Sequence, residues 1–368
     1  MKRVNILAGA ASLALVASPA AAAVSKAVGA ALNQAASAAK SGNSGGVANA
    51  INAAKAAAHT PEEKSKVAQM AAYAYSRTGQ YGKAADELQA SGQGSPKALA
   101  ELYYNAGNYT KAVALAKQAG GPEMTVLIAQ AAIKQGHYAE AVSSYQKLIA
   151  ANGAKPQYLE NLAGAQYKAG DKKGYLATTE KLIHIDASPA RWRTLLVEAQ
   201  KTQMRPEAKL ALFHLMDATG NLTRPEDISE FAKLAIVGNQ PGVAQAVLTK
   251  AGGSLGSDPM TAKLAQAAAQ RSQAAAANAP KLAANADTAS QAGGAYLGLG
   301  QFPAAAAAYG KAAAAPGPNA DQAKVFEGIA QLKGGNAAVA KTTFASVGDA
   351  GGMKDIADLW KLYASTKG

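Results

Sequence analysis

The sequence contains no cysteine among its 368 residues. Without thiols the chain cannot form a disulfide scaffold, a thiolate zinc site, an iron–sulfur cluster or a cysteine nucleophile. Aromatic side chains are also scarce, at 6% of residues, and charged side chains reach only 17%. Strands favour aromatic and β-branched residues, so a sheet-centred fold is not expected. The low charge also argues against a charge-dominated coiled coil.

Alanine is abundant instead, and the chain adds 36 glycines and 14 prolines. Alanine has the highest helix propensity of any residue, so we predict an all-α protein whose helices meet through small side chains. Beyond the N-terminus no stretch approaches the ~18 consecutive apolar residues of a membrane-spanning helix. We therefore expect no integral membrane segment in the mature chain.

The first 23 residues have the pattern of a secretory signal peptide. Lys2 and Arg3 give a basic start, residues 4–16 form a short apolar stretch, and residues 21–23 are the small residues of a cleavage site. We predict cleavage after Ala23 and a periplasmic or secreted protein; the alternative is an uncleaved N-terminal anchor. A lipid anchor at the cleavage site is excluded because its acceptor would be a cysteine.

The formal net charge is +13, and removal of Lys2 and Arg3 lowers it to +11. The basic residues are spread along the chain with no polybasic run, and an exported protein is not expected to meet nucleic acid. Such a charge favours an acidic protein segment or an anionic envelope polysaccharide as partner. Charge that only keeps the protein soluble is the alternative.

A repeated turn organises the chain. In its clearest copies a glycine is followed by an aromatic residue two positions later and by an alanine five positions later, as in Gly79, Tyr81 and Ala84. Glycine ends a helix in the left-handed conformation, and alanine allows the next helix to pack closely. Allowing substitutions, the turn recurs at Gly42, Gly79, Gly107, Gly136, Gly170, Gln203, Asn239, approximately Gln270, Gly300 and Gly335.

Prolines mark the same repeat independently. They fall near the start of the first helix of successive units, where proline is tolerated. These prolines are Pro61, Pro96, Pro122, Pro156, Pro189, Pro225, Pro259 and Pro318. Together with turns spaced near the ~34 residues of a helix–turn–helix repeat, they predict a solenoid of helix pairs. A bundle of long helices is the main competing architecture, and the recurrent glycines and prolines count against it.

The sequence resembles the tetratricopeptide repeat (TPR) family, most closely over residues 125–153. That unit has Ala129 in the inner helix, followed by Gly136, Tyr138, Ala141 and Tyr145. The resemblance covers roughly residues 24–350 and implies a superhelix of helix pairs with a concave groove; another helix-pair solenoid with looser rules is the alternative.

The predicted organisation has four parts. A signal peptide at 1–23 precedes an alanine-rich degenerate helical repeat at 24–60 and a TPR-like solenoid at 61–350. The register is weakest at 258–290, where Pro280 falls at an expected helix interior and predicts a kinked or split unit. A C-terminal capping helix at 351–368 covers the last apolar face.

Signs of chemistry are few. The four histidines, His59, His137, His184 and His214, are far apart, and none has a second ligand three or four residues away. Ser37 with Lys40, and Ser144 with Lys147, match a Ser-x-x-Lys spacing, but the Lys-Thr-Gly element that accompanies it in penicillin-recognising enzymes is missing. We expect no catalytic residue, no metal site and no cofactor, and we predict that the protein is not an enzyme.

One set of residues is a candidate binding stripe. Six cations stand two residues before their turn: Lys40, Arg77, Lys134, Lys168, Lys201 and Lys333. Asn105, Val237, Ala268 and Gly298 interrupt the series. By resemblance these positions, with those of Tyr73, Tyr104 and Tyr167, line the concave groove. Aromatic rings interleaved with cations suit an extended acidic peptide or a glycan. The alternative is that the cations only complement the negative ends of their helices.

The resemblance does not extend to the family's carboxylate clamp, because Gln69 and Tyr73 occupy its first two places. From the sequence we predict a non-enzymatic scaffold or adaptor of the bacterial cell envelope that binds a protein segment in its groove. A carbohydrate- or peptidoglycan-associated module, acting in polymer export or wall remodelling, is the alternative.

Overall fold

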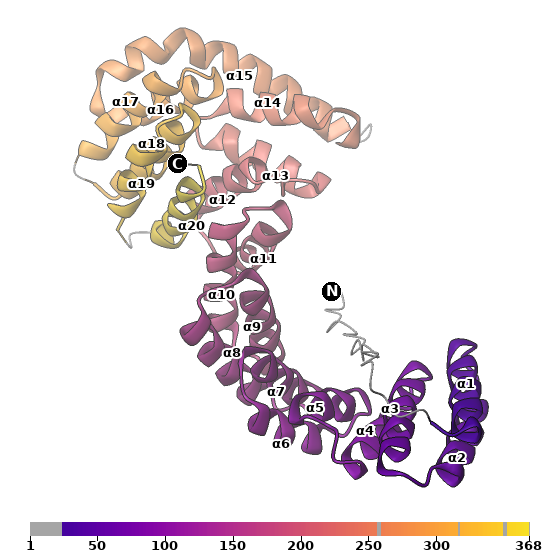
Figure 1. The fold of residues 1–368 in the computed structure, drawn as a ribbon. Coiled ribbons are helices and arrows are strands. Elements are labelled where there is room, and N and C mark those ends of the chain that lie inside the picture. Colours follow the sequence, from indigo (N-terminus) through magenta and orange to yellow (C-terminus); the bar gives the residue numbers. More distant parts are fainter. Residues whose placement is uncertain (1–23, 256–258, 316, 349–351, 368) are drawn as a thin grey trace. The chain divides into compact units, whose positions relative to one another are not determined.

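A computed structural model describes residues 24–255, 259–315, 317–348 and 352–367 (Figure 1). Twenty α-helices and one short 3-10 helix occupy these ranges, with no strand among them, and successive helices pack on one another from α1 to α9 and from α11 to α20. The predicted all-α helical repeat solenoid is confirmed. The chain divides between Tyr175 and Leu176 into two compact units, here called the N-terminal and C-terminal units, where the sequence predicted one continuous solenoid. The signal peptide predicted for residues 1–23 lies outside the described residues.

The N-terminal unit is a series of helix pairs. Its helices are α1 (Lys26–Lys40), α2 (Ser44–Ala57), α3 (Pro61–Arg77), α4 (Tyr81–Ala90), α5 (Pro96–Asn105), α6 (Tyr109–Ala119), α7 (Pro122–Lys134), α8 (Tyr138–Asn152), α9 (Pro156–Ala169) and the start of α10 (Lys172–Ile185). Within this unit the odd-numbered helices line the inner side of the curve and the even-numbered helices the outer side (Figure 1). Direct contacts of α1 with α3 and of α5 with α7 agree with this arrangement, because helices on the inner side of a curve lie closer together than those on the outer side.

The helices begin and end where the repeat predicted. Pro61 opens α3 behind Thr60, whose hydroxyl accepts from the backbone N–H of Glu63 in a capping box. Positive φ values occur at seven of the predicted turn glycines, including 75° at Gly79 and 81° at Gly136. Asn239 takes the same conformation with φ 59° and is the one non-glycine residue with positive φ in the described ranges. The turn positions are therefore confirmed at these eight sites.

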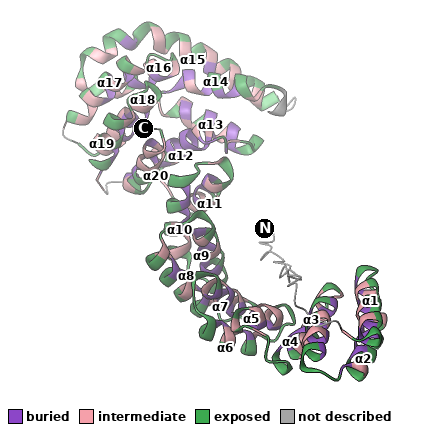
Figure 2. Ribbon diagram, in the orientation of Figure 1, coloured by how far each residue is buried: buried purple, intermediate pink, exposed green. Residues whose placement is uncertain are grey.

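The C-terminal unit contains the remaining helices. These are most of α10, then α11 (Pro189–Gln200), α12 (Pro206–Ala218), α13 (Pro225–Val237), α14 (Pro241–Ala251), α15 (Pro259–Ala284), α16 (Ala286–Gly298), α17 (Phe302–Ala314), α18 (Ala320–Lys333), α19 (Ala337–Ala345) and α20 (Met353–Ser365). A large hydrophobic cluster runs through this unit, whereas the N-terminal unit has several smaller clusters, one every few helices. In both units buried residues alternate with exposed ones along most helices (Figure 2).

Helix α12 is the centre of the C-terminal unit. Its seven consecutive residues 210–216 are all buried, which is the pattern of a helix covered on every side. Helices α11, α13, α18 and α20 all contact it. The indole Nε1 of Trp360 donates to the carbonyl oxygen of Ala211 at 3.0 Å, and the Tyr363 hydroxyl donates to that of Ala218 at 2.9 Å. The C-terminal helix α20 thus closes this unit onto its own middle.

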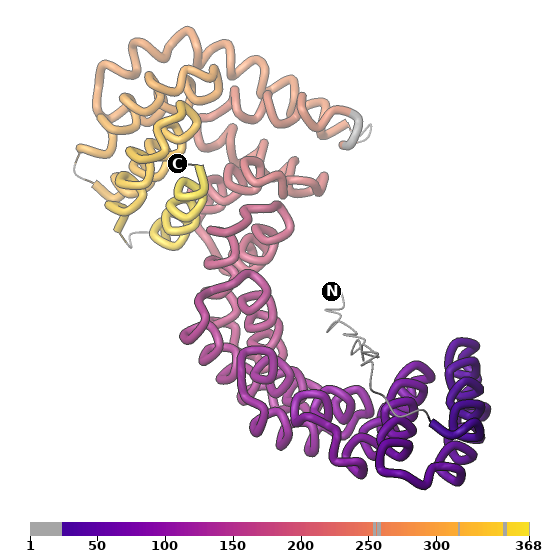
Figure 3. Tube along the Cα trace, viewed as in Figure 1, coloured from indigo at the N-terminus to yellow at the C-terminus, as the bar shows by residue number. Residues whose placement is uncertain are grey.

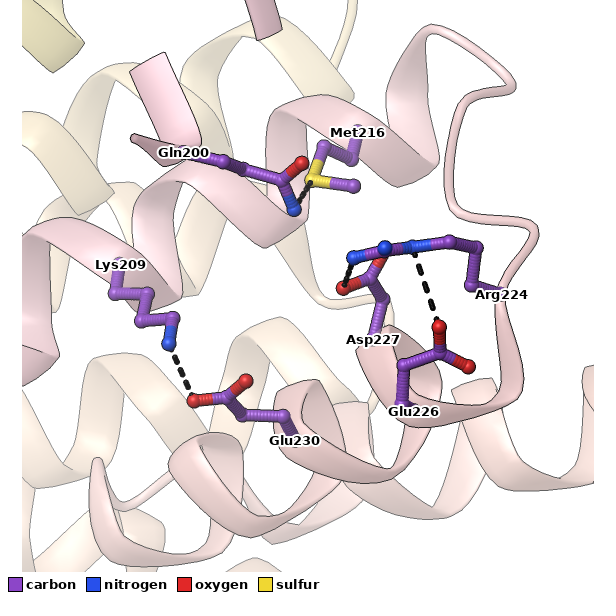
Figure 4. Close-up of polar contacts among 7 residues, drawn as sticks. All are labelled: Gln200, Lys209, Met216, Arg224, Glu226, Asp227 and Glu230. Carbon is purple, nitrogen blue, oxygen red and sulfur yellow. Dashed lines mark hydrogen bonds and ion pairs between the residues drawn. The ribbon is translucent and has the colours of Figure 1, made fainter. Parts of the chain in front are cut away.

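Polar contacts order the start of α13 and join this helix to α12 (Figure 4). The guanidinium of Arg224 donates twice to the carboxylate of Asp227, from Nε and Nη2, each at 2.7 Å. Lys209 on α12 pairs with Glu230 on α13 at 2.5 Å. Because Asp227 is buried, its bidentate partner compensates the loss of water around the carboxylate.

The segment 258–290 corrects one prediction. The turn expected near Gln270 is absent, because α15 continues without a break from Pro259 to Ala284 and includes Pro280 (Figure 3). No glycine occurs between Gly256 and Gly293 to end a helix in the left-handed conformation, and the alanine-rich stretch favours continuation. One continuous helix with Pro280 inside it therefore replaces the split unit that was one of the two expectations. The capping helix predicted at 351–368 is present as α20.

Candidate functional site

Four of the six stripe cations belong to the inner helices of the N-terminal unit. Lys40, Arg77 and Lys134 are the last residues of α1, α3 and α7, and Lys168 is next to last in α9. All four side chains are exposed. Their place at the helix C-termini fits both readings of the sequence, a binding stripe and compensation of the helix dipole.

The contacts of these four side chains help to distinguish a binding stripe from compensation of the helix dipole. In the described part of the chain, no ion pair or hydrogen bond engages the side chains of Lys40, Arg77 or Lys134. The ammonium of Lys168 lies 5.8 Å from the centre of the Tyr138 ring, at the start of the next outer helix back along the chain. Three of the four charges are therefore available to a partner, and the fourth already shows the cation–aromatic contact expected of such a surface.

Two of the three predicted tyrosines are exposed. The residue Tyr73 is 41% exposed and Tyr167 is 64% exposed. Tyr73 stands four residues before Arg77 on α3, so ring and cation share one face of that helix. The Tyr167 ring packs 5.5 Å from Tyr175 within the same unit. A single exposed tyrosine is common, so these rings are informative only together with the exposed cations beside them.

Tyr104 is only half-buried on α5, and its ring meets that of Tyr109 edge-on at 5.5 Å. Burial raises the pKa of the Tyr104 hydroxyl, with a smaller contribution from Tyr109. This tyrosine therefore contributes to packing between α5 and α6 as well as to the inner surface.

The other two stripe cations lie in the C-terminal unit in different surroundings. Lys201 follows α11 and pairs with Glu198 at 3.3 Å. Lys333 ends α18, where desolvation by surrounding atoms lowers its pKa; Asp217 opposes that shift and Lys250 adds to it. Lys201 therefore has a partner in its own unit, whereas Lys333 is an exposed residue whose charge lies near those of Asp217 and Lys250.

The interrupting positions also differ between the units. Asn105 is exposed at the end of α5. In the C-terminal unit Ala268 is fully buried, and the backbone of Gly298 packs against that of Gly242, so these positions form helix contacts. In the C-terminal unit the register thus alternates between exposed residues, such as Val237 and Lys333, and positions used in helix contacts, Ala268 and Gly298.

A groove in the C-terminal unit was not predicted. It encloses about 480 Å³ between the first turns of α12, α16 and α18 and the ends of α13 and α17. We call it the C-terminal groove. Val237, at an interrupting position of the stripe, and Asn239, at a turn, both line it. Those two departures from the repeat were the available sequence signals.

The histidines do not assemble a reactive site. In the described ranges no group of three His, Asp or Glu side chains could hold a metal ion. His214 is buried between Phe231 and Phe326, and one of its ring nitrogens lies 2.6 Å from the amide oxygen of Gln240. Burial lowers the pKa of His214 to about 3, so the ring is neutral. The Gln240 amide donates onward to the Tyr309 hydroxyl, which makes this a structural network.

The serine of the Ser144 motif is committed to the backbone. Its hydroxyl donates to the carbonyl oxygen of Glu140 at 2.8 Å, a common contact of serine inside a helix.

Comparison with known proteins gives no relative: no family model matches the chain, and no curated protein matches it. The TPR resemblance therefore stays a prediction from the repeat residues. Over the described ranges, every helix is too short or too polar to cross a lipid bilayer.

Proposed function

We propose that this protein is a non-enzymatic, TPR-like scaffold or adaptor of the bacterial cell envelope. Its ligand is an acidic protein segment, held along the inner layer of the N-terminal unit. The observation that carries the proposal is the exposure of Tyr73 and Tyr167 on helices whose last turns present Arg77 and Lys168.

Binding would be additive along the inner layer. Each cation–carboxylate pair at an exposed site contributes about 0.2–1 kcal/mol, and each cation–ring contact about 0.5–1 kcal/mol. Four inner helices that each supply one cation can therefore hold a segment that no single helix would hold. The helices are formed before the ligand arrives, which lowers the entropy lost on binding.

The envelope location rests on residues 1–23. Their basic start, apolar stretch and small residues support export, and the net charge of +11 after cleavage suits acidic partners. N-terminal sequencing of the exported protein tests this part alone, with Val24 as the expected first residue.

The binding proposal is tested with the double variant Lys134→Glu, Lys168→Glu. We expect it to lose binding of a fluorescent polyglutamate peptide and of an envelope protein co-purified with the wild type. The matched control is Lys117→Glu, Lys147→Glu, which reverses two exposed cations on the outer helices α6 and α8. Both variants should keep the wild-type helical circular dichroism.

Equal loss of binding in both variants would reduce the effect to net charge, and unchanged binding in the inner-helix variant would contradict the proposal. Raising the salt concentration should weaken wild-type binding, because exposed charges are screened over about 10 Å at 0.1 M.

A second candidate, an envelope carbohydrate or peptidoglycan, is favoured by one observation. The Tyr167 ring, beside Tyr175, offers an exposed aromatic face of the kind on which a sugar ring can stack. Retention on purified sacculi that is lost in Tyr167→Ala but kept in the double cation variant would favour this ligand over an acidic peptide.

A further inference from the structure

The C-terminal groove departs from the repeat that surrounds it. In the stripe the residue two before the turn is a cation, but here it is Val237, whose side chain is 75% exposed. At most turns the left-handed residue is glycine, but here it is Asn239, which places an amide at the groove. The exposed Val237 and the left-handed Asn239 thus set this turn apart from the turns that carry a cation and a glycine.

Primary amides dominate the polar lining. Asn239 in the turn after α13, Gln291 on α16, and Asn319 with Gln322 at the start of α18 come from three different segments and meet around the groove. None of these four side chains forms a hydrogen bond to another residue of the described ranges. Each primary amide both donates and accepts, so together they can pair with the N–H and C=O groups of an extended peptide.

The charge of the groove has one sign. Glu207 and Asp287 line it and no lysine or arginine does, although the chain as a whole is strongly basic. One carboxylate oxygen of Glu207 is buried without a hydrogen bond, and its cation partner Arg205 is 3.6 Å away. Asp287 has no ion pair among the described residues. Both acids lie in first helical turns, where the helix dipole also favours them, yet a cationic ligand would still gain from their charge.

The apolar part of the lining selects between ligand classes. Leu210, Leu234 and Val237 supply aliphatic surface, and none of the described residues that line the groove is aromatic. A sugar would therefore find no ring on which to stack, whereas a small aliphatic side chain of a peptide fits. The volume of about 480 Å³ lies within the ~300–1,000 Å³ of typical ligand sites.

We propose that the C-terminal groove is a second binding site, for a short extended peptide segment that carries a lysine or arginine. Its backbone pairs with the amides, its basic side chain reaches Asp287 and Glu207, and a small apolar side chain packs against Val237. This site is independent of the inner layer of the N-terminal unit and has the opposite charge preference. The two sites would let one chain hold two chemically different segments.

The test uses the mature chain, residues 24–368, and two acetylated alanine-rich pentapeptides that differ only in a central lysine or glutamate. Affinity is measured by isothermal titration calorimetry, and the site is located by NMR of methyl-labelled valine. We expect the lysine peptide to bind and to shift the Val237 methyl signals, while the glutamate peptide binds at least about fivefold more weakly.

Variants then assign the contacts. Asp287→Asn and Gln291→Ala should each weaken the lysine peptide by about fivefold. The matched control is Glu226→Gln, an exposed acid in the first turn of α13 that does not line the groove. The inner-helix variant Lys134→Glu, Lys168→Glu should bind the lysine peptide as the wild type does, which separates this proposal from the proposed function.

Equal affinity for the two peptides, unmoved Val237 signals, or an unchanged Asp287→Asn variant would each overturn the proposal. Tighter binding of a glucosamine tetramer than of the lysine peptide would also overturn it, because the site would then belong to an amino sugar.

Discussion

Removal of the Trp360 side chain should open the C-terminal unit. Trp360 is 1% exposed, stacks on Phe344 at 5.9 Å and meets Tyr363 edge-on at 5.7 Å. Its indole N–H also donates to the Ala211 carbonyl on α12, which is 149 positions away in sequence. Trp360→Ala therefore removes a large buried ring and the link between the last helix and the middle of the unit.

The expected loss of stability is about 4 kcal/mol, within the ~3–5 kcal/mol measured when buried aromatic residues become alanine. For a unit of this size that loss lowers the melting temperature by about 8–16 °C. Trp360→Phe keeps most of the apolar contact but loses the hydrogen bond, so we expect a loss of about 1–2 kcal/mol.

Tryptophan fluorescence is the assay, because the chain has two tryptophans and both belong to the C-terminal unit. In the variant Trp192 remains, packed against Tyr363, and reports the unfolding of this unit alone. Far-UV circular dichroism reports both units. The control is Val339→Ala, which shortens a half-exposed side chain on α19 and should change little.

An unchanged fluorescence midpoint in Trp360→Ala would refute the reasoning, because α20 would then be an attached helix and not the closure of the unit. Equal shifts of fluorescence and dichroism transitions would also refute it, since the loss should stay in one unit.

Three further predictions concern pH and close packing. Hydrogen bonds from Ser25, His59 and Thr60 lower the pKa of Glu63 from 4.5 to about 2. The contribution of the ionised Glu63 to folding stability should therefore be complete above pH 4.5 and disappear as the pH falls through 2. Glu63→Gln should flatten the dependence of stability on pH over this range, measured by circular dichroism. Burial lowers the pKa of His214 from 6.5 to about 3. As the pH falls below 6.5 the unfolded state takes up a proton that the folded state does not, so the C-terminal unit should lose stability. His214→Gln should remove this dependence of stability on pH in the fluorescence assay. Gly298→Ala should destabilise the C-terminal unit by about 1–3 kcal/mol in thermal unfolding, because the added Cβ would lie 2.6 Å from the Cα of Gly242. Gly164→Ala is the matched control: the position has open space around it, so the substitution should stabilise α9 by about 0.5–1 kcal/mol.

The repeat was predictable because its signals are local. Glycine at a helix end and proline at a helix start act over a few residues. Glycine takes the left-handed conformation without strain, and proline lacks only an N–H that has no partner in the first turn. Gly79, Gly136 and Pro61 therefore lie where their spacing predicted. The failure near Gln270 has the same explanation in reverse, since that segment contains no glycine and the helix simply continues.

Closure of the C-terminal unit depends on long-range packing, which the repeat pattern does not encode. Residues 210–216 are buried on every side of their helix, so more helices than the two neighbours in sequence must pack around them. Which helix supplies the cover could not be inferred, because the Trp360 contact with Ala211 spans 149 residues.

The stripe illustrates the limit of register as a guide to a site. A fixed position in every repeat predicts a shared surface only while successive units pack in the same way. That condition holds for Arg77 and Lys134 on inner helices. In the C-terminal unit Gly298 occupies the same position of its repeat, but it lies in a close helix contact with Gly242. Where the packing changes, an exposed Val237 replaces the cation and a groove of the opposite charge preference forms. Val237 and Asn239, which depart from the cation and the glycine of the other turns, are thus the positions that point to this groove.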